Sequence, residues 1–328
     1  MGAFYKWGIK MNDITSLGEI LIDFTSQGVN GQGQRVFAQN AGGAPANVAV
    51  AVARLGGKSA FAGKAGNDMH GRFLKSTLEN NGVHCSSLIL DDDYFTTLAF
   101  VDLKEDGERE FSFARKHGAD KMLTKKDIPL DLIKNSKVFH FGSVSLTDEP
   151  SRSATLYAAE EARNAGVTVA YDPNYRASLW DSKEKATWEM RQAAQLADLI
   201  KISDEEAKLL TGESDCEKAA EKLTANRTKI AVVTLGKDGA YVRTKDGGKF
   251  VKGFAVNAVD CTGAGDAFWG GFLLKVCQCS KKPDNIMLDE AAEFALFGNA
   301  VASICVERHG AIPSLPTFEE VESRVKVT

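Results

Sequence analysis

Strand-like and helix-like segments alternate along this chain from about residue 14 onward. The apolar stretch 14–24 predicts a strand, and the small apolar residues of 44–55 predict a tightly packed helix. Alternation of this kind predicts parallel strands joined by crossover helices that cover both faces of a sheet. The expected fold class is therefore α/β with a mostly parallel central sheet. Further strands are expected at 59–64, 137–141, 167–171, 198–202 and 230–235, and further helices at 71–80, 151–164, 188–196 and 204–210.

Two segments depart from this alternation. Residues 27–34 are rich in Gly, Gln and Asn, and 94–115 has the pattern of two strands around a turn at 104–107. A β-hairpin inside a series of βα units suggests an excursion from the main sheet such as a lid, and a surface hairpin without a role fits the pattern equally well. Because no repeat or linker marks a second domain, we expect one domain over 13–328 with an N-terminal extension at 1–12.

The overall composition limits the classes of partner. The formal net charge is −4 and no basic tract is present, which argues against nucleic acid. No apolar stretch reaches the roughly 18 residues that span a bilayer. The six cysteines form no Cys-x-x-Cys pair and the five histidines show no metal-ligand spacing, so we expect reduced thiols and a cytoplasmic location. Small metabolites remain as the expected partners.

The run Val-Asp-Cys-Thr-Gly-Ala-Gly-Asp-Ala-Phe at 259–268 carries the strongest chemical signal. Its small residues at 263–265 leave the backbone open, and the apolar segment 267–276 predicts a buried helix. Phosphate binds the bare N–H groups at such a helix start, where the macrodipole contributes about half a positive charge. Asp266 would stand beside that anion site, where a hydroxyl could lose its proton. The run therefore suggests phosphoryl transfer to an alcohol, with an ordinary capped loop as the alternative.

The positive helix end also bears on the charge of Asp266. A positive neighbour opposes a raised carboxyl pKa, so we expect Asp266 to stay ionised.

Two other phosphate motifs fail on inspection. A Walker loop needs glycine five residues before the Gly57-Lys58-Ser59 run, and Val52 is there instead. A dinucleotide fingerprint would begin at Gly263, but Phe268 holds the third glycine position. A nicotinamide-dependent dehydrogenase is accordingly disfavoured.

Two polar runs carry side chains that could bind a sugar. The run 40–47 leads into the helix expected at 44–55, and the run 172–176 follows the strand expected at 167–171. Paired Gly42 and Gly43 let a ligand approach the backbone, and Asn47 can both donate to and accept from a hydroxyl. Arg176 follows an expected strand, and ligands of open α/β sheets bind outside the carboxyl ends of strands. Asp23 has the same placement after the first expected strand. Ordinary turns with solvated side chains are the alternative for each.

Together these runs resemble the ribokinase-like sugar kinases, also called the phosphofructokinase B family. Residues 18–23 are similar to the first strand of that family, 42–47 to its N-terminal signature and 260–268 to its C-terminal signature. The resemblance covers about 13–318, with Cys261 in place of a common threonine. It implies a three-layer α/β/α fold, with a small β lid formed from about 24–40 and 94–115.

The resemblance also implies roles for matching residues around the reaction. Asp266 matches the catalytic base. The anion hole of the family matches Gly263, Ala264 and Gly265. The sugar-binding positions of the family match Asp23, Gly42, Gly43, Asn47 and Arg176.

The nucleotide and metal positions are implied in the same way. ATP and Mg²⁺ are the implied cofactors, with K⁺ as a further candidate. Glu206 matches a residue that organises Mg²⁺ through water, with Ser203 in the place of an asparagine, and Asp260 matches a monovalent-cation position. The nucleotide-binding positions match Ser203, Glu206, Thr234, Gly236, Gly239 and Asn299.

Within the family, the runs at 42–47, 172–180 and 203–206 are most similar to bacterial fructokinases. The implied activity is ATP-dependent phosphorylation of D-fructose to D-fructose 6-phosphate. Arg176 would suit a carboxylate as well as a hydroxyl, so 2-keto-3-deoxygluconate kinase is an alternative. A non-catalytic sugar-binding protein on the same fold is another. An apolar face of the lid could also pair two subunits as a homodimer.

Overall fold

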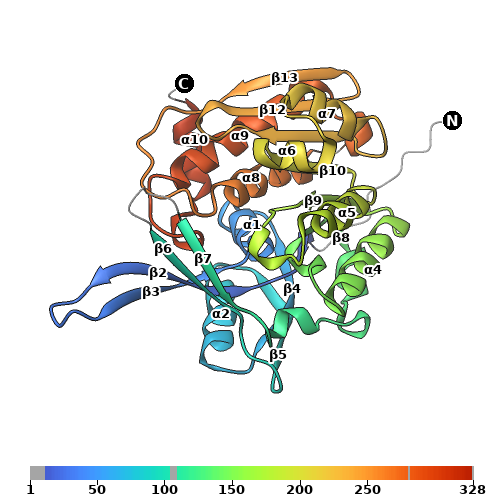
Figure 1. Cartoon of the computed structure of the whole chain (residues 1–328). Helices are drawn as coiled ribbons and strands as arrows, with labels where there is room; N and C mark the ends of the chain where they lie inside the picture. Colours follow the sequence, from blue (N-terminus) through green and yellow to red (C-terminus); the bar gives the residue numbers. More distant parts are fainter. Residues whose placement is uncertain (1–11, 104–108, 280, 327–328) are drawn as a thin grey trace.

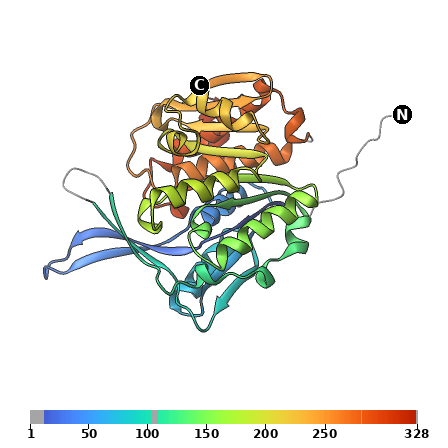
Figure 2. The ribbon, with the colours of Figure 1, turned by 45° about the vertical axis from the view of Figure 1, so that its right-hand side comes forward.

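The computed structural model describes residues 12–103, 109–279 and 281–326 (Figure 1). These residues form a large sheet covered by helices on both faces and a small sheet that projects from one side (Figures 1 and 2). No helix among them is both long and apolar enough to cross a bilayer. Of the extension expected at 1–12, residues 1–11 lie outside the described residues. Asn12 is the first residue of β1, so that boundary was one residue too late.

The large sheet has nine strands in the order β13-β12-β11-β10-β9-β8-β1-β4-β5. The strands from β5 to β11 pair in parallel, as the alternation predicted, and the β11-β12-β13 edge is antiparallel. The strands are β1 (Asn12–Leu17), β4 (Ser59–Gly66), β5 (His84–Asp91), β8 (Ser136–Gly142), β9 (Thr168–Asp172), β10 (Leu199–Ser203), β11 (Ile230–Thr234), β12 (Gly239–Thr244) and β13 (Gly247–Lys252).

Side chains of the buried strands divide between two cores. Along β11, Ile230 and Val232 enter one core whereas Ala231 and Val233 enter the other, because successive side chains of a strand point to opposite faces. Helices α1, α2, α8, α9 and α10 pack into the first core, and α3 to α7 pack into the second. The helices are α1 (Ala44–Arg54), α2 (Met69–Asn80), α3 (Leu130–Lys134), α4 (Ser151–Asn164), α5 (Lys183–Ala194), α6 (Asp204–Thr211), α7 (Cys216–Thr224), α8 (Ala264–Gln278), α9 (Leu288–Cys305) and α10 (Phe318–Lys326).

Small residues allow α1 and α8 to approach each other closely. A Cβ atom built on Gly270 of α8 would lie 2.5 Å from the Cβ of Ala51 in α1, well inside van der Waals contact. The tight helix packing that the small residues of 44–55 predicted is therefore found. It brings the beginnings of two helices that are far apart in the sequence to the same place.

The single strand predicted over 14–24 was wrong. β1 ends at Leu17, and the chain enters β2 (Leu21–Val29) of the small sheet after a break at Gly18. Gly18 has φ +152°, and a Cβ there would lie 2.7 Å from Cγ of Pro45, so only glycine fits this corner. The apolar run hid the break because residues on both sides of it are buried. Asp23 consequently lies in the small sheet and not at the end of a central strand.

The small sheet has the order β3-β2-β6-β7. Besides β2 it contains β3 (Arg35–Gly42), β6 (Leu98–Leu103) and β7 (Arg109–Ala114). β2 pairs antiparallel with β3 and parallel with β6, so the two segments that departed from the alternation meet in one sheet. The turn predicted at 104–107 lies outside the described residues.

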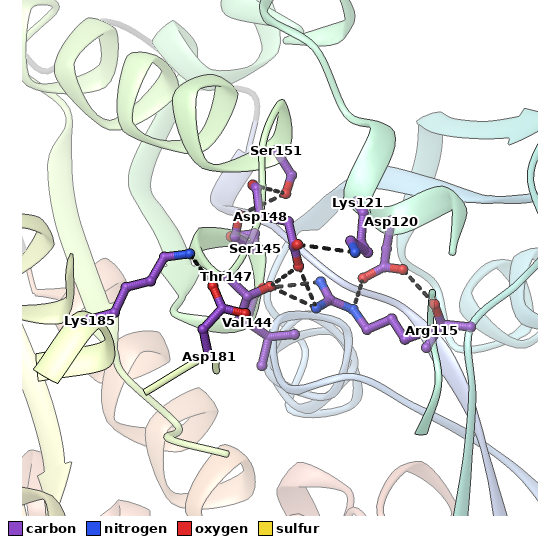
Figure 3. Close-up of polar contacts among 11 residues, drawn as sticks. Arg115, Asp120, Lys121, Val144, Ser145, Thr147, Asp148, Ser151, Asp181 and Lys185 are labelled. Carbon is purple, nitrogen blue, oxygen red and sulfur yellow. Dashed lines mark hydrogen bonds and ion pairs between the residues drawn. The ribbon is translucent and has the colours of Figure 1, made fainter. Parts of the chain in front are cut away.

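A buried ion pair anchors this small sheet to the body of the molecule (Figure 3). Arg115 directly follows β7, and its Nε donates to Oδ2 of Asp120 at 2.8 Å. Its other nitrogens donate to Oγ1 of Thr147 at 2.7 Å and to the carbonyl oxygen of Val144 at 3.1 Å. Thr97, just before β6, donates to Oδ1 of Asp120 at 2.5 Å. Both strands of the β6–β7 hairpin therefore join the body at one carboxylate.

We expect Arg115→Met to lower the free energy of unfolding by about 3–5 kcal/mol, because it leaves the carboxylate of Asp120 buried without its cation. Urea unfolding at pH 7 measures this. The control is Lys185→Met, which removes the pair between Lys185 and Asp181, whose side chains are 37% and 81% exposed. That change should cost less than about 1 kcal/mol. Equal losses in the two variants would contradict the anchoring role of Arg115.

Candidate active site

The carboxylate of Asp266 is held between two amide side chains. It lies in the first turn of α8 and is 6% exposed. Asn47 of α1 donates from Nδ2 to its Oδ2 at 2.7 Å, and Asn174, after β9, donates from Nδ2 to its Oδ1 at 3.1 Å. Three segments that are distant in the sequence thus meet at one carboxyl group. Asn174 was not among the predicted site residues. Its place in the turn after an expected strand was the signal that could have found it.

The backbone before Asp266 takes the conformation that an open helix start requires. Gly263 precedes α8 with φ +76°, and a Cβ on it would lie 2.8 Å from the Cβ of Ala311. Glycine is needed there for both reasons. Gly263 and Gly265 line a cavity, whereas Ala264 between them is not among the lining residues.

We expected Asp266 to stay ionised because the positive helix end opposes a raised pKa. The pKa is raised nonetheless, although the carboxyl group is still mostly ionised at pH 7. Burial raises the pKa of Asp266 to about 6, and repulsion from Asp172 adds to the rise. Lys201, the hydrogen bond from Asn47 and Arg176 oppose it without cancelling it. Removal of the carboxylate from water therefore outweighs the positive helix end. A carboxyl group with this pKa can take up and release a proton near neutral pH.

Two cavities adjoin at Asp266. The larger has a volume of about 850 Å³ and the smaller about 170 Å³. Each cavity could hold one of two reactants. The carboxylate of Asp266 would then lie where a group passes from one reactant to the other. The walls of both include Asn174, Arg176, Cys261, Gly263 and Asp266.

The smaller cavity collects most of the predicted sugar-binding residues. Asp23, Gly43, Asn47 and Arg176 line it. Gly42 does not, but a Cβ there would lie 2.0 Å from Oδ2 of Asp23, so glycine at this position makes room for that carboxylate. Burial raises the pKa of Asp23 to about 7, with Arg176 lowering it and Asp266 raising it further.

Glu19 is a further acid of the smaller cavity that the sequence interpretation missed. It is 3% exposed, and its Oε1 accepts a hydrogen bond from the backbone N–H of Ala44 at 3.1 Å. Burial raises its pKa to about 7. Its Oε2 is buried without a hydrogen-bond partner among the described residues. An acid beside the glycine at a strand end was the available signal.

The larger cavity collects several of the predicted nucleotide-binding residues, namely Ser203, Glu206, Thr234 and Gly236. Ser203 and Glu206 cap α6 together. The backbone N–H of Ser203 donates to Oε2 of Glu206 at 2.9 Å, and that of Glu206 donates to Oγ of Ser203 at 3.2 Å. Oε1 of Glu206 accepts from the backbone N–H of Tyr175 at 2.6 Å. Burial, then repulsion from Asp172, raises the pKa of Glu206.

Three other predicted residues do not line either cavity. Asn299 donates from Nδ2 to the carbonyl oxygens of Val251 and Lys252 at 3.1 and 3.2 Å, which ties α9 to β13. Gly239 begins β12 with φ +106° where a Cβ would lie 2.2 Å from the Val251 oxygen. Asp260 accepts from the backbone N–H of Thr262 at 2.8 Å and from that of Gly310 at 2.9 Å. It thus braces the turn that leads to Gly263.

Comparison with known families gives one match over almost the whole chain. The family described as pfkB family carbohydrate kinase matches residues 11–318. Fructokinase-2 of Oryza sativa subsp. japonica is 45% identical over 321 residues, which cover 96% of this chain and 94% of that protein.

Solved structures agree with this match. Fructokinase from Xylella fastidiosa with bound ATP superposes with a TM-score of 0.87 at 33% identity, over 96% of this chain and 98% of that one. A double-mutant fructokinase from Vibrio cholerae O395, with fructose, ADP and a potassium ion bound, superposes with a TM-score of 0.85 at 35% identity, over 96% and 99%. The three-layer fold with a small β sheet is therefore shared with these enzymes.

Proposed function

The chain belongs to the pfkB family of carbohydrate kinases, and we propose that it transfers the γ-phosphoryl group of ATP to D-fructose, giving D-fructose 6-phosphate and ADP. The observation that carries the proposal is Asp266, held by Asn47 and Asn174 where a smaller and a larger cavity meet. The 45% identity to a fructokinase supports fructose as the acceptor.

Fructose would occupy the smaller cavity, with Asp23, Gly43, Asn47 and Arg176 around its hydroxyl groups. Gly42 would act indirectly by giving Asp23 its space. The β-lid contributes Phe113 of β7 to this cavity, so closure of the lid would exclude water as a competing acceptor.

The nucleotide would occupy the larger cavity along Ser203, Glu206, Thr234 and Gly236. We place Gly239 and Asn299 in support of that wall. The volume of this cavity is several times that of the smaller one. This difference fits a nucleotide in the larger cavity and a monosaccharide in the smaller one.

In the transfer itself, Asp266 would accept the proton of the attacking hydroxyl while the γ-phosphate rests on the open turn Gly263–Ala264–Gly265. A positioned general base typically contributes about 10²–10⁴-fold in rate, and each preorganised donor about 10²–10³-fold. The three oxygens of the transferring group require two hydrogen-bond donors or more. The backbone N–H groups at the start of α8 can supply them.

The ions would be held at the edges of this site. The described residues contain no group of three or more His, Cys, Asp or Glu side chains that could hold a metal. Mg²⁺ typically keeps several waters and binds phosphate oxygens, so one carboxylate such as Glu206 suffices to orient its water shell. Each carboxylate oxygen of Glu206 has a second lone pair for this. The carboxylate oxygens of Asp260 would contact K⁺ in the same way.

We also propose a cytoplasmic location, which the state of the thiols supports. All six cysteines are free in the structure, which suits the reducing cytoplasm.

We also propose that two copies pair through the outer face of the lid. Phe100 of β6 is 37% exposed and stacks with Phe24 at a centroid distance of 5.3 Å. Phe37 of β3 lies on the same face and meets the Phe100 ring edge-on at a centroid distance of 5.8 Å. An apolar face on a projecting sheet is typical of an interface.

The experiment that tests the activity is an ATP-consumption assay with fructose, ribose, 2-keto-3-deoxygluconate, adenosine and fructose phosphates as acceptors. We expect fructose to give the highest kcat/KM. Preference for 2-keto-3-deoxygluconate would instead assign Arg176 to a carboxylate. Sugar binding without any phosphoryl transfer would make the protein a non-catalytic binder.

We expect Asp266→Asn to lower kcat by at least about 10²-fold, because the amide cannot accept the hydroxyl proton. Calorimetry should find fructose and ATP binding retained. The exposed Asp181→Asn serves as the control and should keep the turnover of the wild type. Near-normal turnover in Asp266→Asn would remove Asp266 as the base.

The pH profile should report the raised pKa of Asp266. Because the base acts only when ionised, kcat/KM should be constant above about pH 7 and fall about tenfold per pH unit below its pKa of about 6. Asn47→Ala removes a hydrogen bond that lowers this pKa, so it should move the acidic limb to higher pH. It should also weaken fructose binding more than ATP binding. A limb near pH 4 in the wild type would contradict the assignment.

Analytical ultracentrifugation tests the lid interface. We expect a species of twice the mass of one 35.4 kDa chain, and Phe100→Glu should convert it to the monomer. Phe250→Glu, at an exposed phenylalanine of β13 outside the lid, is the control and should leave the dimer intact. A monomeric wild type would rule the interface out.

A further inference from the structure

Lys201 is a buried lysine at the floor of the larger cavity. It lies in β10, and its side chain is 6% exposed. Its Nζ lies 2.6 Å from Oδ2 of Asp172, which ends the neighbouring strand β9. Among the described residues, this is the one hydrogen-bond partner of its ammonium group. An ammonium has three N–H donors, so two of them can donate to acceptor atoms of a molecule bound in the larger cavity.

The ammonium lies directly against the turn before α8. A Cβ atom built on Gly265 would be 3.0 Å from Nζ of Lys201, and the two residues line the same cavity. The missing side chain at position 265 is therefore what allows the ammonium to come this close. Arg176, Lys183 and Lys208 also line the cavity, but they are exposed. Charge interactions are strongest for a buried cation, because little water screens it.

The surroundings of Lys201 are strongly acidic. Burial lowers its pKa, but attraction to Asp172, Glu206 and Asp266 outweighs burial and raises the pKa, so the amine is charged at neutral pH. Three carboxyl groups thus lie around one cation. A phosphoryl group that carries negative charge would be repelled from this place unless a cation faced it.

We propose that Lys201 is a further catalytic residue, whose ammonium donates to an oxygen of the phosphoryl group under transfer from below the Gly263–Gly265 turn, and that Asp172 is the residue that positions it. This rests on the proposed kinase function. The opposing possibility is that Lys201 and Asp172 form a purely structural pair between β9 and β10.

The step balances without a change in the protonation of Lys201. The hydroxyl oxygen of the sugar forms a bond to the γ-phosphorus, the bond from that phosphorus to the β–γ bridging oxygen breaks, and the electron pair stays with ADP. The hydroxyl proton passes to the carboxylate of Asp266. Lys201 keeps its proton throughout and acts on the charge of the transferring group.

The test compares Lys201→Met with the wild type in kinetics and in binding of a transition-state mimic. We expect kcat to fall by about 10²–10³-fold, as for loss of one preorganised donor. The KM for fructose and the Kd for ADP, which lacks the γ-phosphate, should change by less than about threefold. The affinity that ADP gains on addition of aluminium fluoride, a planar mimic of the transferring phosphoryl group, should fall by the same factor as kcat.

Two further variants complete this set. Lys201→Arg keeps a cation on a bulkier planar group and should recover part of the turnover that Lys201→Met loses. Lys134→Met removes a lysine from the pair with Glu161 on the surface and should leave every parameter unchanged. Unchanged kcat and unchanged aluminium fluoride binding in Lys201→Met would overturn the proposal.

The acidic limb of kcat/KM separates a charge effect from a structural one. Lys201 lowers the pKa of Asp266 and Asp172 raises it. Lys201→Met should therefore move the limb to higher pH, whereas Asp172→Asn should move it to lower pH. A structural pair would lose stability in both variants without these opposite shifts, and shifts in the same direction would contradict the proposal.

Loss of one buried partner can also prevent folding, because it leaves the other charge uncompensated. If Lys201→Met does not fold, the double variant Lys201→Met/Asp172→Asn removes both charges. We expect this variant to fold and to show the same loss of kcat and of aluminium fluoride binding. A wild type without any sugar kinase activity would overturn the proposed function itself. An active wild type with an equally active double variant would overturn the role of Lys201 alone.

Discussion

The contact between Asp266 and its two amide donors is the interaction on which the site depends. It joins the start of α8 to α1 through Asn47 and to the turn after β9 through Asn174. The contact exists because Gly270 lets α8 pack against Ala51 of α1. A larger side chain at that crossing would separate the two helix starts and with them the two cavities. Close packing in the core and chemistry at the site therefore have one origin.

The same packing buries several acids, and burial destabilises their ionised forms. Asp266, Asp23, Glu19 and Glu206 are all acids whose pKa is raised chiefly by burial. For each of them, folding becomes less favourable as the pH rises from the pKa of the unfolded chain through the raised pKa of the folded one. For Asp266 the raised pKa has a chemical consequence, because a carboxylate removed from water is a better proton acceptor near neutral pH than one at the surface. Lys201 offsets part of this charge from inside.

The small sheet is attached to the body of the molecule close to the smaller cavity. It projects from the body, and both ends of the β6–β7 hairpin are tied to the body at one buried ion pair, Arg115 with Asp120. Phe24 of β2 and Gln39 of β3 also contact His70 of α2, so the sheet meets the body at a second place. Val144, which accepts from Arg115, also lines the smaller cavity. The anchor of the small sheet and the wall of the smaller cavity are therefore directly connected.

Much of this protein was determined by its sequence alone. The alternation of strand-like and helix-like segments predicted the parallel sheet, and α4 begins and ends at the predicted residues. The open turn at 263–265 with Asp266 marked a helix start that borders both cavities, because glycine and a following acid are local signals. The β12–β13 edge, the break at Gly18 and the displacement of Asp23 into the small sheet were not predicted. They depend on partners that no local pattern contains.

Only the tertiary structure decided which residues meet at the site and how they are charged. Asn174, Glu19 and Lys201 entered the site because strands far apart in the sequence end side by side. The raised pKa of Asp266 was missed for the same reason, since burial and the repulsion from Asp172 are properties of the assembled fold. A sequence specifies the chemistry that each side chain can perform, whereas distance and solvent exclusion, which set its charge and its partners, arise only when the chain has packed.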